Sequence, residues 1–305
     1  MYSQELHNKK LVEILNELVR VCESYNLKYY LAYGTAIGAV RHHAIIPWDD
    51  DIDVLMPRKD LERLYTIKDE AFGKDFQFSS YRYTDGFLYD MAKLESLTST
   101  IIERVNPIYV GGIYVDIFPL ENVPDEDTDK KWVHEVASII PGYSKFLVCE
   151  EPKTYLLKYL LYKFRRKRFL RSAPLWKWDG IVSQFKDVDT KYVKDYHCDF
   201  LYKQYFDRDV FGEGTEMEFE GNKYIIPKDY DTYLTVSYGD YMQPPPEKER
   251  VLKHNYLFED CERRLSSEEL KPIIKELKAK YNYHFSLSKE CRMIFDKVKR
   301  IVSFS

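Results

Sequence analysis

The sequence predicts an α+β (α/β-type) protein, built on a mixed β-sheet with flanking helices and a helical insertion. Apolar residues recur at three- and four-residue spacing in residues 4–25, which is typical of an amphipathic helix. Residues 76–119 hold several short β-rich runs separated by polar or Gly/Pro turns. The pattern turns helical after Pro124 and returns to β near residue 215. We therefore expect a core in two parts (1–124 and 211–260), a helical insertion (125–210) and C-terminal helices (261–305).

The first elements follow one another in a simple order. The helix over residues 4–25 ends near Asn26, and residues 29–33 form a buried strand that leads into a turn at Gly34-Thr35. A short helix over residues 36–41 and an acidic strand around Asp53 come next. A helix is predicted over 57–72, followed by strands at 76–78, 89–94, 100–102 and 113–118 that complete the mixed sheet. A hairpin of 216–219 and 223–226 comes later in the chain. Further helices are predicted over 128–140, 153–171, 230–236, 266–281 and 286–302.

Charge and cysteine content limit the class of protein. The 305 residues carry 46 Lys+Arg against 50 Asp+Glu, so we expect no nucleic acid polymer as a partner. The five cysteines are odd in number and form no Cys-x-x-Cys motif, which favours reduced thiols in a cytoplasm. Residues 1–10 are polar, so we expect no signal peptide, and the sequence contains no uncharged run long enough to span a bilayer. The expected location is cytoplasmic, either free or peripheral on the inner face of the cell membrane.

An acidic stretch carries the chemistry that we expect. Four carboxylates lie within five positions between apolar residues: Asp49, Asp50, Asp51 and Asp53. They repel one another, so folding them together is unfavourable unless a cation or solvent relieves the repulsion. In a strand, Asp49, Asp51 and Asp53 share one face, and Asp50 then points out of the site. Three converging carboxylates predict a site for Mg²⁺ or Mn²⁺.

Two simpler explanations of these carboxylates fit less well. An EF-hand calcium loop fails because, counted from Asp49, its sixth and twelfth positions hold Val54 and Asp60 in place of Gly and Glu. A solvated acidic turn is disfavoured because the flanking Ile, Trp, Val and Leu residues place the carboxylates in or beside a core. The Gly34-Thr35 turn indicates a phosphate-binding site. Glycine allows close approach of the backbone, and amides at a helix start bind phosphate oxygens.

One further acid stands inside an apolar strand. Asp116 lies between Val115 and Ile117, where an isolated carboxylate is costly to bury unless it is paired or ligates a metal. We therefore predict Asp116 as another carboxylate donor to the metal site, with a salt bridge to an Arg or Lys as the alternative.

A basic segment lies in the predicted insertion. In residues 153–171, Lys and Arg alternate with Leu and Phe. Such a segment suits contact with anionic lipid or with an anionic, lipid-linked acceptor. An ordinary helix with a solvated charged face explains it equally well, because a basic bias alone does not separate the two.

Four blocks of the sequence closely resemble the LicD family of phosphocholine transferases, which is related to the fukutin-type phosphosugar transferases. The blocks are Gly34–His42 with Ile46–Asp53, Lys93 with Thr98, Val115–Leu120, and Tyr238–Met242 with Arg250 and His254. They follow the family order and cover residues 28–120 and 215–255. Residues 125–210 and 260–305 match no block, and we expect them to select the acceptor.

The resemblance implies a nucleotidyltransferase-like fold in which Asp51, Asp53 and Asp116 hold the metal ion. It also implies a CDP-choline donor, or another CDP-alcohol. The implied acceptor is a hydroxyl of a glycan or lipid-linked glycan, such as a teichoic acid, capsule or lipopolysaccharide precursor. The residues expected to bind the donor are Gly34, Thr35, Arg41, His42, Lys93, Thr98, Arg250 and His254.

Within this hypothesis, the acceptor hydroxyl attacks the phosphorus that bears choline, and CMP leaves. Asp49 or Asp116 is the candidate general base. One alternative is a true nucleotidyltransferase that acts on a small hydroxyl compound with the same carboxylates. Another is an inactive, membrane-associated interaction module, which the intact carboxylates disfavour because a module without metal chemistry need not retain repulsive groups.

Overall fold

The computed structural model describes residues 3–105, 108–124, 168–196, 205–252 and 256–281, together with residues 131, 164 and 254. Most of the basic segment 153–171, for which lipid contact and an ordinary solvated helix were both open, lies outside these residues. The helices predicted over 128–140 and 286–302 lie outside them as well, apart from residue 131. Within the described part of the chain, no helix combines the length and the apolar character needed to cross a membrane.

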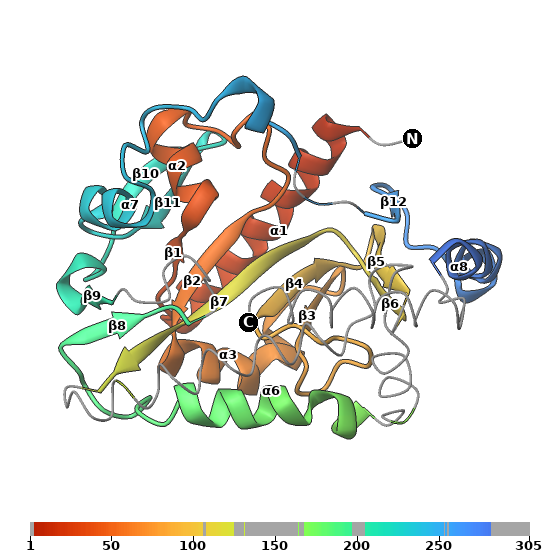
Figure 1. Cartoon of the computed structure of the whole chain (residues 1–305), viewed down its shortest axis with the longest axis horizontal. Helices are drawn as coiled ribbons and strands as arrows, with labels where there is room; N and C mark the ends of the chain where they lie inside the picture. Colours follow the sequence, from red (N-terminus) through yellow and green to blue (C-terminus); the bar gives the residue numbers. More distant parts are fainter. Residues whose placement is uncertain are drawn as a thin grey trace, which may run out of the picture.

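A seven-stranded mixed sheet forms the centre of the molecule (Figure 1). Five strands lie side by side in the order β1 (Tyr30–Leu31), β2 (Asp53–Pro57), β7 (Tyr114–Val123), β4 (Ala92–Ser96) and β3 (Phe76–Ser79). β8 (Tyr192–Lys194) pairs with the second half of β7, and β9 (Phe206–Asp207) pairs with β8. β2 and β7 run parallel, whereas the other pairs are antiparallel. The predicted α+β fold with a mixed sheet is confirmed.

Helices cover both faces of this sheet. α1 (Gln4–Tyr25) and α3 (Arg58–Ala71) pack against the face that carries Val54. α2 (Tyr33–Arg41) and α7 (Tyr230–Tyr238) share a second apolar cluster with Leu55 on the opposite face. The other helical elements among the described residues are α6 (Arg168–Val182), α8 (Ser267–Tyr281) and two short 3₁₀ turns, η2 (Arg208–Val210) and η3 (Glu247–Glu249).

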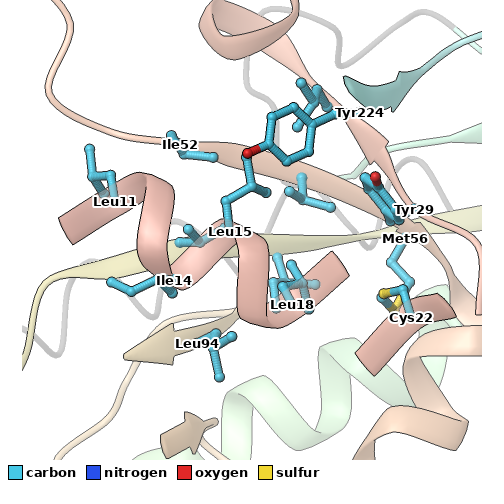
Figure 2. Close-up of a cluster of buried hydrophobic side chains, with 14 of the residues drawn as sticks. Leu11, Ile14, Leu15, Leu18, Cys22, Tyr29, Ile52, Met56, Leu94 and Tyr224 are labelled. Atoms are coloured by element: carbon cyan, nitrogen blue, oxygen red, sulfur yellow. The ribbon is translucent and has the colours of Figure 1, made fainter. Parts of the chain in front are cut away.

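The larger core cluster forms because α1 presents one apolar stripe to the sheet (Figure 2). Leu11, Ile14, Leu15 and Leu18 are fully buried there against side chains such as Leu94. Each buried side chain of this kind contributes about 1.5–3 kcal/mol to the free energy of unfolding. The helix ends at residue 26 as predicted, in a left-handed residue whose N–H bonds back to the last turn. The stripe fixes α1 behind the strands that carry the acidic residues.

The described residues also form two smaller sheets. The predicted hairpin is confirmed as β10 (Thr215–Phe219) and β11 (Asn222–Ile226). β5 (Thr100–Val105), β6 (Ile108–Gly111) and β12 (Phe258–Asp260) form a separate sheet. The prediction that the strand at residues 100–102 completes the mixed sheet is therefore wrong. Ile102 packs with Leu265 and Leu270 beneath α8, which draws β5 away from β4.

Two local predictions around the acidic stretch are also wrong. α2 begins at Tyr33, so Gly34 and Thr35 lie in its first turn and form no separate turn. β2 begins only at Asp53. Residues 49–52 precede that strand in an irregular segment, where the N–H of Asp49 donates to the carbonyl of Ile46 at 2.8 Å. The alternation of a strand therefore does not decide which way Asp49–Asp51 point.

Candidate active site

A row of three charged side chains crosses the middle of the sheet. Asp53 of β2 pairs in register with Asp116 of β7, and Asp116 pairs with Lys93 of β4. Side chains at paired positions project from the same face of a sheet. The row therefore brings together, from three separate strands, two of the predicted metal ligands and the predicted phosphate-binding lysine.

Asp116 is buried with an unsatisfied oxygen. Its side chain is 7% exposed, and its Oδ1 accepts no hydrogen bond from the described residues, although Lys93 Nζ lies 3.7 Å away. Burial raises the pKa of Asp116 to about 6, even though the charge of Lys93 favours the ionised form. The predicted alternative, a salt bridge, is present only as this long contact, so the carboxylate retains an oxygen for another ligand.

Asp49 and Asp51 approach this row from the irregular segment before β2. Burial, and next the charge of Asp49, raises the pKa of Asp51 to about 8. The charge of Asp116 acts in the same direction, which places Asp51 close to the row. Asp51 therefore lies near both Asp49 and Asp116, and the bend of residues 49–52 places it there.

Contrary to the prediction, the side chain of Asp50 does not point out of the site. It is 1% exposed, and its carboxylate accepts hydrogen bonds from the ring and the backbone N–H of His254 at 2.9 and 3.2 Å. Burial by itself would lower the pKa of His254, but this hydrogen bond and the charge of Asp51 raise it to about 9. The ligand atoms of Asp50, Asp51 and His254 lie within 4.8 Å of one another. The segment from α7 to β12 passes over α2 in Figure 1, and its His254 places a positively charged side chain beside the carboxylates.

The first turn of α2 lies directly beside the acids. The hydroxyl of Thr35 accepts a hydrogen bond from the N–H of Asp53 at 2.9 Å. A Cβ added to Gly34 would overlap Oδ2 of Asp49, so glycine is what allows the carboxylate to sit against the helix. As predicted, Gly34 and Thr35 lie beside the carboxylates. Their amides belong to the start of a helix and not to a separate turn.

Sequence reasoning missed the partner of Lys93. Both carboxylate oxygens of Glu103 lie 3.2 Å from Lys93 Nζ, and the hydroxyls of Tyr89 and Tyr114 donate to the same carboxylate. Burial opposes ionisation, but the charge of Lys93 and the two hydroxyls hold the pKa of Glu103 below its usual value. The signal that identified Asp116 is weaker at Glu103, because this acid follows Ile101 and Ile102 but stands next to Arg104.

The other predicted donor-binding residues lie apart from the row. Arg41, His42 and Arg250 gather around Trp48 at the far end of α2, about 10 Å along the helix from Gly34. Burial, and next the charge of Arg250, lowers the pKa of Arg41, and neither arginine forms an ion pair with a carboxylate in the described part of the chain. Thr98 contacts Lys10 and Ser96 and is not brought to the acids.

The donor set fits a divalent cation. Asp51, Asp53 and Asp116 supply only carboxylate oxygens, and Oδ1 of Asp116 accepts no hydrogen bond from the described residues. Hard oxygen ligands of this kind bind divalent cations that also contact substrate phosphates.

Comparison with known proteins agrees with this interpretation of the site. Residues 26–147 match the LicD/FKTN/FKRP nucleotidyltransferase domain. Over 273 residues the chain is 27% identical to the lipopolysaccharide cholinephosphotransferase LicD of Haemophilus influenzae, an alignment that covers 82% of this chain and 96% of the relative. These matches support a LicD family transferase of phosphorus-containing groups. The mixed sheet is consistent with a nucleotidyltransferase-like fold.

Two further relatives come from Rickettsia. An uncharacterized protein of Rickettsia typhi is 38% identical over 182 residues, which cover 55% of this chain and 57% of the relative. An uncharacterized protein of Rickettsia prowazekii is 24% identical over 186 residues, which cover 55% and 67%. The matched domain contains the acidic stretch, Lys93 and Asp116, whereas Arg250 and His254 lie beyond it.

Proposed function

We propose that the protein transfers phosphocholine, or a related phospho-alcohol, from a CDP-linked donor to a hydroxyl of a cell-surface glycan precursor and releases CMP. The observation that carries the proposal is the row of Asp53, Asp116 and Lys93 beside the first turn of α2. The name of the Haemophilus relative supports choline phosphate as the transferred group and lipopolysaccharide as the first acceptor to test. Teichoic acid and capsule precursors are the other candidate acceptors.

Asp51, Asp53 and Asp116 would hold Mg²⁺ or Mn²⁺. Their oxygen-only ligand set supports this choice, as does Oδ1 of Asp116, which accepts no hydrogen bond within the described part of the chain. When bound, the ion neutralises charge on the donor diphosphate and on the leaving CMP.

The protein's own cations and amides bind and orient the donor. The amides of the first turn of α2 receive a phosphate oxygen, and Lys93 supplies a fixed positive charge beside the acids. Arg41 and Arg250 lie next to each other without a carboxylate partner among the described residues, which suits them to an anionic part of the donor. His42 and His254 are orienting groups in this scheme.

The chemical step requires a base for the acceptor hydroxyl. The hydroxyl oxygen attacks the phosphorus that bears choline, the bond from that phosphorus to CMP breaks, and the hydroxyl proton passes to the base. Asp49 suits this part better than Asp116, because its carboxylate is half-buried beside α2 whereas that of Asp116 is buried.

The product distinguishes this function from its alternative. Incubation with Mg²⁺, CDP-choline and lipopolysaccharide, followed by other CDP-alcohols and glycans, should release CMP in equal amount to the phosphocholine attached to the glycan. Asp53→Asn should abolish transfer and leave the protein folded, while the exposed control Asp69→Asn should keep full activity. Release of pyrophosphate from a nucleoside triphosphate, with no transfer of phosphocholine, would instead identify a nucleotidyltransferase.

Peripheral attachment to the inner face of the cell membrane belongs to the same proposal. It rests on the basic pattern of residues 153–171, most of which lie outside the described residues. A lipid-linked acceptor would bring the glycan to the site from that surface.

A further inference from the structure

We propose that Tyr33 contacts the substrate, and that its hydroxyl donates a hydrogen bond to a phosphate oxygen of the CDP-linked donor. This inference rests on the proposed function, because it takes the donor diphosphate to lie at the first turn of α2. Tyr33 is the first residue of that helix.

The backbone of Tyr33 is strained. Its φ is +48°, in the left-handed region that glycine adopts readily and a bulky side chain does not. Two hydrogen bonds hold the chain in this conformation: the N–H of Ala32 donates to the carbonyl of Asp53 at 3.0 Å, and the N–H of Tyr33 donates to the hydroxyl of Tyr233 at 3.3 Å. Strained residues of this kind cluster at functional sites, where the surrounding structure holds them in place.

The hydroxyl of Tyr33 is buried and unsatisfied. The residue is 8% exposed, and its oxygen forms no hydrogen bond with any residue that the structure describes. Nearly all buried polar side-chain atoms have a partner, so an orphaned hydroxyl calls for an explanation. The neighbouring Tyr30 shows the ordinary case, because its hydroxyl donates to the carbonyl of Gly212 at 2.6 Å.

The ring of Tyr33 lies on the acidic face of the sheet. It packs edge to face against Phe118, with ring centroids 5.5 Å apart and an angle of 89° between the rings. Phe118 follows Asp116 by two positions in β7, so the two side chains project from the same face. The next residue in the chain, Gly34, lies against the carboxylate of Asp49. Tyr33 thus lies on the same face of the sheet as Asp116 and is the chain neighbour of the residue that contacts Asp49.

A phosphate oxygen is the partner that this position favours. The amides of the helix start attract anions, and a phenol hydroxyl donates a short, strong hydrogen bond to an anionic oxygen. The backbone strain and the unsatisfied hydroxyl of Tyr33 both oppose folding. A role in substrate binding explains why the protein keeps both features.

The test compares Tyr33→Phe with Tyr30→Phe, which removes a satisfied hydroxyl from the same apolar cluster. Tyr33→Phe should leave the thermal midpoint unchanged or higher, because it removes an unsatisfied polar atom, and should lower kcat/KM for CDP-choline on the order of 10- to 100-fold. Tyr30→Phe should lower the thermal midpoint and keep kcat/KM within about twofold of the wild type.

Binding of CDP with Mg²⁺, measured by calorimetry on the same proteins, separates this inference from the proposed function. If the wild type does not transfer phosphocholine from CDP-choline, the proposed function fails. The affinity for CDP still tests the role of Tyr33 in that case. A folded Tyr33→Phe protein that binds CDP and turns over like the wild type overturns the inference. Weaker CDP binding by Tyr33→Phe alone supports it.

Discussion

Lys93 is a buried cation that the protein holds in place from two sides. Glu103 accepts from its ammonium group, and the ring of Tyr114 lies 3.2 Å from Nζ. Asp116 stands at 3.7 Å, too far for a hydrogen bond. Glu103 therefore keeps Lys93 close to Asp116 without letting it occupy the carboxylate oxygens.

Glu103→Gln tests this positioning. Without the negative charge of Glu103, Lys93 should move toward Asp116 and compete with the metal ion, so that metal affinity and kcat/KM both fall about 10-fold. The exposed control Glu218→Gln should change neither quantity. Unchanged metal affinity in a folded Glu103→Gln protein would contradict the positioning role.

At the scale of elements, the first turn of α2 contacts the acidic segment. The sequence indicated that glycine and carboxylates belong together, because close backbone approach and a phosphate-binding helix start leave a clear pattern. It did not indicate that Asp49 lies against Gly34 itself, because this contact depends on the bend of residues 49–52, which no periodicity describes.

Gly34→Ala measures the importance of this contact. The new Cβ would displace the carboxylate of Asp49, and a shift of about 1 Å in a catalytic group lowers turnover on the order of 100-fold. Gly180→Ala in α6 is the matched control, since its Cβ meets nothing within 4 Å, and it should raise stability by about 0.5–1 kcal/mol at unchanged activity. Circular dichroism and thermal unfolding confirm that both proteins fold. Wild-type turnover in Gly34→Ala would show that the position of Asp49 does not limit the reaction.

At the scale of the whole molecule, the site combines segments that are distant in the sequence. Asp53, Lys93 and Asp116 come together because three strands pair in register. An isolated acid in an apolar strand was enough to select Asp116 from sequence. The contact of His254 with Asp50 joins residues 204 positions apart, and the segregation of β5 into its own sheet depends on packing beneath α8. Local patterns carry no information about such contacts.

Direct titration of the protein with Mn²⁺ or Mg²⁺ by calorimetry tests the central claim, that Asp51, Asp53 and Asp116 hold a divalent cation. Carboxylates bind the ion only when they are ionised, and burial raises the pKa of Asp116 to about 6 and that of Asp51 to about 8. Affinity should therefore rise between about pH 6 and about pH 8, with protons released on binding, and Asp116→Asn should weaken binding at least about 10-fold. Affinity that is independent of pH and unchanged in Asp116→Asn would contradict the claim.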